Sequence, residues 1–109
     1  MSARTSPICR LVEYGQSPWY DNLRRKLITN GDLAGLREED CIRGVTSNPT
    51  IFEKAVSAGE EYDAAVAELA RQGMSTDDIG WTLVTEDVAA ACEVLRPAFE
   101  ETGGGDGFV

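Results

Sequence analysis

The stretch GVTSNPTIFEKAVSAG, residues 44–59, passes from an apolar run through the polar segment TSNP into a helical pattern. The apolar run forms the last part of a strand that is predicted at 41–46. Asn48 followed by Pro49 supplies a helix N-cap with proline at the first helical position, which is a common way for a helix to begin. The stretch therefore predicts a strand that leads directly into a helix. Helix capping by itself accounts for the polar residues, and contact with a ligand is the alternative.

Strands and helices alternate on both sides of this stretch. A short strand is predicted at 18–21, and DGFV at 106–109 is typical of the beginning of another strand. Apolar spacing and capping residues predict helices in the following places: one that ends near Tyr14, two that flank a turn at Asn30 and Gly31, one from Pro49 or Thr50 to about Ser57, one that ends near Gly73, and one from about Ser75 to near Pro97.

This order of elements predicts an α/β fold with parallel strands and helical crossovers. Parallel strands need neighbours on both sides and helices on both faces, and two complete strands are too few to provide them. We therefore expect residues 1–109 to be the opening section of a larger α/β protein. The glycine-rich GGGDGFV does not suit a phosphate loop, because such a loop lies between a strand and a following helix.

Charge and composition exclude several classes of function. Nineteen acidic residues against ten basic ones give a net charge of -9, which disfavours binding to nucleic acid or to an anionic membrane. Histidine is absent from the sequence, which excludes imidazole metal ligands and a Ser-His-Asp triad. No segment is typical of a signal peptide or a membrane span. A cytoplasmic protein is the expectation.

The three cysteines, Cys9, Cys41 and Cys92, are odd in number and far apart in the sequence. This pattern matches neither a disulfide framework nor a CxxC metal motif. The sequence therefore predicts three reduced thiols and no metal site.

Polar residues follow both predicted strands. In a parallel α/β barrel, residues at the C-terminal ends of strands face the active site. Asp21 ends the first strand, and Thr46 and Asn48 lie at and after the end of the second, so a carboxylate, a hydroxyl and an amide could converge there. The alternative for Asp21 is a plain N-cap of a helix that starts at Asn22.

Two further groups of residues suggest structural roles. Trp19 and Trp81 are expected to pack in the interior, because tryptophan buries a large area. Arg24, Arg25 and Lys26 are expected to lie on a solvated helix face, because charged residues usually stay exposed.

GQSPWYDNLRR (15–25), followed by GVTSNPTIFEKA (44–55), closely resembles the N-terminal part of transaldolase, in the longer form found alone or fused to glucose-6-phosphate isomerase. DGFV at 106–109 resembles the start of that family's third strand. The resemblance implies that residues 1–109 are the N-terminal fragment of a (β/α)8 barrel. A leading segment would occupy 1–15, and the first two βα units with the start of strand three would occupy 16–109.

The resemblance also implies an activity. Transaldolases transfer a dihydroxyacetone unit from a ketose phosphate to an aldose phosphate through a lysine Schiff base, in the pentose phosphate pathway, with no cofactor or metal. Asp21 matches the family's acid/base on the sugar hydroxyl. Thr46 and Asn48 match residues that hold the site and the dihydroxyacetone hydroxyls.

The family's Schiff-base lysine, on strand four, and its phosphate-binding residues have no counterpart in this chain. Lys26 lies in a charged cluster and Lys54 in a predicted helix, so neither has the apolar pocket that activates a nucleophilic lysine. We therefore expect the chain alone to be inactive, and to be poorly folded or self-associating because its strand edges and helix faces are uncovered. The alternative function is a free-standing acidic helical module that binds another protein through an exposed apolar patch.

Overall fold

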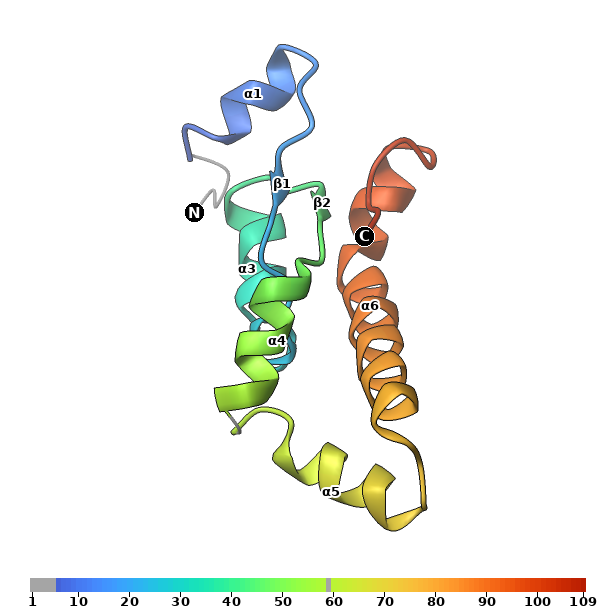
Figure 1. The fold of residues 1–109 in the computed structure, drawn as a ribbon. Helices are drawn as coiled ribbons and strands as arrows, with labels where there is room; N and C mark the ends of the chain where they lie inside the picture. The colour runs from blue at the N-terminus through green and yellow to red at the C-terminus, as the bar shows by residue number, and fades with distance from the viewer. Residues whose placement is uncertain (1–5, 59) are drawn as a thin grey trace.

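The computed structural model describes residues 6–58 and 60–109. Along the chain the elements are α1 (Cys9–Glu13), β1 (Trp19–Tyr20), α2 (Arg25–Thr29), α3 (Asp32–Glu39), β2 (Gly44–Val45), α4 (Pro49–Ala58), α5 (Asp63–Arg71) and α6 (Thr76–Glu101) (Figure 1).

The two strands pair in parallel, with Trp19 opposite Gly44 and Tyr20 opposite Val45. Phe108 forms a parallel bridge with Gly44, and the backbone N–H of Val45 donates to the carbonyl of Phe108 at 3.1 Å. Three successive segments of the chain therefore run in the same direction with helices between them. The predicted parallel α/β arrangement is confirmed, although both strands are shorter than predicted, and no barrel is formed by the described residues.

Gly44 on β2 makes room for the indole of Trp19 from the neighbouring strand. The indole of Trp19 crosses it so closely that a Cβ added at Gly44 would lie 2.3 Å from a ring atom, well inside van der Waals contact. Trp19 itself remains 42% exposed. The indole of Trp19 therefore packs as predicted on only one face of its ring.

Predicted capping and turn residues mark the start of α6 and the ends of α2 and α5. The Ser75 hydroxyl accepts from the backbone N–H of Asp78 at 3.2 Å at the start of α6. Gly31 has a φ of 85° in the turn between α2 and α3, and Gly73 has the same φ after α5. Glycine adopts this left-handed conformation without steric cost, so the predicted turns at these two positions are confirmed.

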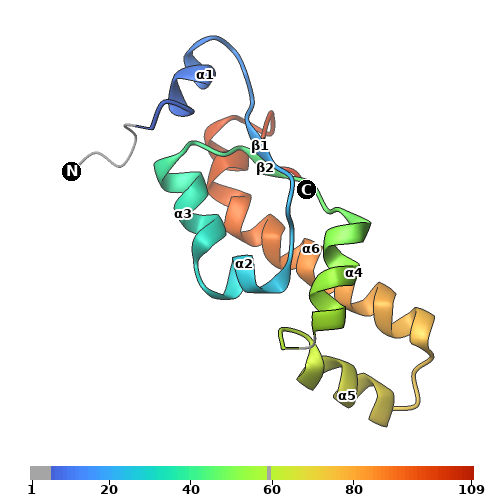
Figure 2. The ribbon, with the colours of Figure 1, turned by 60° about the vertical axis from the view of Figure 1, so that its left-hand side comes forward.

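The long helix α6 packs against two groups of apolar residues. Its C-terminal half lies beside α2 and α3, and its N-terminal half lies beside α4 and α5 (Figure 2). The first group contains the buried residues Leu23, Leu27, Leu33, Val45, Ala91 and Leu95. The second contains Ala55, Tyr62 and Leu83. Buried side chains on α6 recur every four residues, at 83, 87, 91 and 95, which places them on one face of the helix.

The expectations for the cysteines and for Trp81 are wrong. Cys9 and Cys41 form a disulfide, with their Cα atoms 5.1 Å apart, and only Cys92 carries a free thiol. The fold brings the first two cysteines together across 32 residues of sequence. Trp81 is 70% exposed and does not pack in the interior, because it lies off the face of α6 that holds Leu83.

In the part of the chain that the structure describes, no helix is both long enough and apolar enough to cross a membrane.

Candidate active site

The C-terminal ends of β1 and β2 bring two of the predicted site residues into contact. The backbone N–H of Thr46 donates to the carbonyl of Tyr20 at 2.9 Å, which extends the parallel pairing one residue past Val45. The hydroxyl of Thr46 then donates to Oδ1 of Asp21 at 2.5 Å. Asp21 is exposed and Thr46 is half-buried. The carboxylate is therefore fixed by a neighbouring strand while remaining open to solvent.

Asp21 does not cap a helix. The helix predicted to start at Asn22 begins instead at Arg25, and its N-cap residue is Arg24, which makes no side-chain capping bond. The chain between Tyr20 and Arg24 is extended or irregular, so Asp21 lies too far from the first turn of α2 to cap it. Thr46 is the hydrogen-bond partner that the structure gives to its carboxylate.

Asn48 caps α4, as its position before Pro49 predicts. Its carbonyl oxygen Oδ1 accepts from the backbone N–H of Thr50 at 3.0 Å. This contact engages the oxygen of the carboxamide, whereas the nitrogen of the same group is a donor. Capping and ligand binding are therefore compatible in one side chain.

Asn48 also lines a groove of about 470 Å³ between α4 and α6. Ser47 contributes a second polar side chain to its wall. The apolar lining includes Phe52 from α4 together with Trp81 and Val84 from α6. The loop after β2 thus borders a hollow that can hold a small molecule or an apolar side chain.

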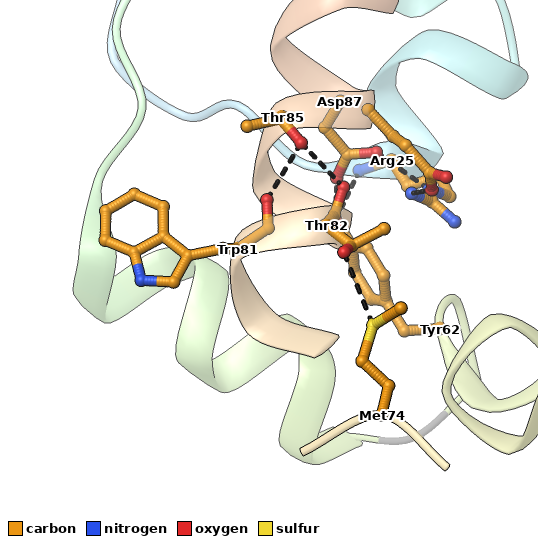
Figure 3. A network of polar contacts seen from close by, with 8 residues as sticks. Arg25, Tyr62, Met74, Trp81, Thr82, Thr85 and Asp87 are labelled. Carbon is orange, nitrogen blue, oxygen red and sulfur yellow. Dashed lines mark hydrogen bonds and ion pairs between the residues drawn. The ribbon is translucent and has the colours of Figure 1, made fainter. Parts of the chain in front are cut away.

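A buried polar cluster connects α2, α6 and the residue before α5 (Figure 3). Asp87 is 3% exposed and accepts from the Tyr62 hydroxyl at 2.5 Å and from Nε of Arg25 at 2.7 Å. The Tyr62 hydroxyl accepts in turn from the backbone N–H of Arg25 at 2.9 Å. The Arg25 guanidinium also lies over the Tyr62 ring, 4.9 Å from its centroid.

The expectation that Arg24, Arg25 and Lys26 lie on a solvated face is confirmed for Lys26, which is exposed, and is wrong for Arg25. Arg24 pairs with Glu61 at 3.2 Å, and the carboxylate of Glu61 also accepts from the backbone N–H of Lys26 at 2.9 Å. The Arg25 side chain is only 22% exposed. These contacts fix the first turn of α2, which has no capping side chain of its own, relative to α6.

Contacts within this cluster raise the pKa of both Tyr62 and Arg25. Burial, together with the hydrogen bond to Asp87, raises the pKa of Tyr62, so the phenol remains a donor. Burial alone would lower the pKa of Arg25, but the hydrogen bond and negative charge of Asp87 outweigh it and the pKa is raised. Sequence reasoning missed Asp87, although one signal was present: it lies four residues from both Leu83 and Ala91 in an apolar stripe.

Comparison with known proteins assigns the family. The sequence model of the family described as transaldolase/fructose-6-phosphate aldolase matches residues 18–109. The chain belongs to this family. The resemblance drawn from the two sequence motifs is thereby confirmed.

Individual transaldolases are similar over nearly the whole chain. Transaldolase 2 of Streptomyces coelicolor is 43% identical over 105 residues, which are 96% of this chain and 28% of that protein. The transaldolase of Mycobacterium marinum is 43% identical over 109 residues, or 100% of this chain and 29% of the relative. Transaldolase 1 of Streptomyces avermitilis is 45% identical over 100 residues, which are 92% of this chain and 26% of that protein. The chain thus spans less than a third of these relatives.

Both lysines of this transaldolase-family chain lie on the surface. Lys26 and Lys54 are exposed, and they line one open cavity together with Glu60 and Glu61. Such a site is solvated and polar, whereas a nucleophilic lysine needs an environment that favours its neutral form. Among the described residues, no cluster of three or more acidic or cysteine side chains could hold a metal ion.

Proposed function

We propose that this chain provides the first two strands of the active site of a cytoplasmic transaldolase. The complete enzyme would transfer a dihydroxyacetone unit from a ketose phosphate to an aldose phosphate in the pentose phosphate pathway. The observation that carries this proposal is the hydrogen bond between Thr46 and Asp21 at the C-terminal ends of adjacent parallel strands. That edge is where enzymes built on a (β/α)8 barrel bind their substrates.

Asp21 is assigned the acid/base role. Its Oδ1 accepts from the Thr46 hydroxyl at 2.5 Å, which orients the carboxylate and leaves Oδ2 for a sugar hydroxyl. Asp21 would take the proton of that hydroxyl while the carbon-carbon bond breaks, and would return a proton to the incoming aldehyde when the new bond forms. Thr46 would act as a positioning residue in this scheme, because it acts through Asp21.

Asn48 is assigned to the dihydroxyacetone hydroxyls. Its oxygen is held by the N–H of Thr50 at 3.0 Å, so the helix cap fixes the orientation of the amide nitrogen. A rigid donor of this kind suits a neutral hydroxyl. The Schiff-base lysine, which must hold the other half of the sugar, is assigned to a part of the enzyme outside residues 1–109.

The chain of residues 1–109 should form no Schiff base with fructose 6-phosphate. Lys26 and Lys54 are exposed among charged residues, and neither lies in the apolar pocket that a nucleophilic lysine needs. Incubation with the sugar and borohydride, followed by peptide mass spectrometry, measures this. The Lys26→Arg and Lys54→Arg variants serve as controls for nonspecific labelling. A sugar-dependent adduct on either lysine would refute the assignment of the nucleophile to another part of the enzyme.

Substitutions at Asn48 should separate capping from substrate binding. Asp and Ser cap helices about as well as Asn, but neither has an amide donor. In the full-length enzyme, Asn48→Asp and Asn48→Ser should therefore keep the melting temperature. Loss of one hydrogen bond should lower kcat/KM by up to about tenfold, and Asn48→Asp should lose more because it adds a negative charge beside the site. Wild-type kinetics in both variants would leave Asn48 with the capping role alone.

The exposed Trp81 supports a second candidate function. A tryptophan that is 70% exposed beside an apolar groove suits a module that binds another protein. Such a module would need no catalysis, whereas the transaldolase proposal requires transfer activity from the full-length protein. An assay with fructose 6-phosphate as donor and an aldose phosphate as acceptor distinguishes the two. Turnover supports the enzyme, and its absence in a correctly folded full-length protein favours the module.

A further inference from the structure

The Cys9–Cys41 disulfide joins the first helix to the segment that leads into β2. The bridge closes a loop that contains β1, Asp21, α2 and α3. Cys41 is 7% exposed and adopts a φ of 59°, a conformation that residues other than glycine rarely adopt. Cys9 is half-buried in α1. One sulfur is therefore anchored in the body of the protein, and the other belongs to a peripheral helix.

α1 has little else to hold it. None of its residues is buried, and the neighbouring apolar side chains Ile8, Leu11 and Tyr14 are 39%, 45% and 75% exposed. In Figure 1, α1 stands at one end of the molecule, away from α6. A helix of five residues is too short to persist by its own hydrogen bonds in water. The disulfide is thus the main tether of α1 in the described part of the chain.

We propose that Cys9 and Cys41 form a reversible thiol-disulfide site, whose partner is a dithiol reductant and whose oxidation state decides whether α1 is docked. A thiolate of the reductant attacks the more accessible sulfur, that of Cys9, and Cys41 leaves as a thiolate. The second thiol of the reductant then attacks the mixed disulfide and releases Cys9. The disulfide gains two electrons and two protons, and the reductant becomes a disulfide.

Reduction releases α1 from the loop before β2. Without the tether, the five-residue helix unfolds, and its backbone groups form hydrogen bonds with water in place of those within the helix. The first βα unit, which carries Asp21, also loses the loop constraint that the bridge places on its unfolded state. The family model matches from residue 18, so the bridge ties a segment that precedes this model to the fold that carries the candidate site.

Differential alkylation and hydrogen exchange test the proposal on the purified full-length protein. After mild oxidation, the peptides of Cys9 and Cys41 should resist alkylation while the peptide of Cys92 reacts. Dithiothreitol without denaturant should make all three reactive. Amide exchange in residues 9–13 should then speed up by roughly tenfold or more, the expected response of a detached short helix. Reoxidation should restore the slow exchange.

Three variants make the result specific. Cys9→Ser and Cys41→Ser should each show fast exchange of α1 under oxidising conditions, with no further response to dithiothreitol. Cys92→Ser should respond as the parent protein does. Full alkylation of Cys9 and Cys41 after oxidation would overturn the proposal. So would a bridge that resists reduction in the folded protein, or exchange in α1 that is the same in both states.

Discussion

Replacing Asp21 by alanine in the full-length enzyme should lower turnover by about two to four orders of magnitude, the usual range for an acid/base group. Schiff-base formation should survive, because Asp21 is assigned to proton transfer during cleavage and not to attachment of the sugar. Borohydride trapping measures attachment, and steady-state kinetics measures transfer. Asp21→Ala should therefore still give the trapped adduct while its rate of transfer falls.

Two further variants define the role of Asp21. Thr46→Val removes the hydroxyl that donates to Oδ1 at 2.5 Å and should lower turnover less than Asp21→Ala, because the carboxylate is disordered but still present. Asp63→Ala removes another exposed carboxylate, in the first turn of α5, and should leave turnover unchanged. Normal turnover in Asp21→Ala would reject the catalytic assignment.

Replacing Asp87 by alanine should lower the free energy of unfolding by about 3 to 5 kcal/mol, the cost of removing one partner from a buried charge pair. The change leaves the Arg25 guanidinium without its carboxylate and the Tyr62 hydroxyl without its acceptor. It also opens a cavity on the buried face of α6. Urea unfolding followed by circular dichroism measures the loss.

The neighbouring residue supplies a matched control. Glu86 contacts the same Arg25 side chain at 3.1 Å, but its own side chain is 55% exposed. An exposed ion pair contributes little, so Glu86→Ala should cost less than about 1 kcal/mol. Tyr62→Phe keeps the ring and removes the hydroxyl. Its loss in the free energy of unfolding should lie between those of Asp87→Ala and Glu86→Ala. Equal losses in Asp87→Ala and Glu86→Ala would show that burial of the carboxylate does not decide the effect.

Much of the fold could be predicted from local signals. Asn48 before Pro49, Ser75 before α6, and the glycines at positions 31 and 73 act within one turn of chain, and the structure confirms each of them. The order of parallel segments also followed from the alternation of strands and helices. Strand lengths did not follow, because hydrogen bonding with neighbouring segments decides where a strand ends.

The errors concern contacts between distant residues. Cys9 and Cys41 are 32 residues apart and meet only because α1 folds back toward the segment before β2. Arg25 was expected in solvent, but Asp87 binds it from 62 residues away. For Asp21, the alternative role as a helix cap is not met, because α2 begins at Arg25. The sequence pattern of a single helix or strand does not indicate which distant residue it will contact. An acidic residue within an apolar stripe does indicate that it has a buried partner.

A structure of the full-length enzyme with the borohydride-reduced sugar adduct tests the central claim most directly. The account predicts the Asp21 carboxylate within hydrogen-bond distance, about 2.6 to 3.2 Å, of a sugar hydroxyl. The Thr46 hydroxyl should still donate to Oδ1, and the Asn48 amide nitrogen should donate to a hydroxyl of the dihydroxyacetone unit. An adduct bound with Asp21 and Asn48 both out of contact with the sugar would contradict the account.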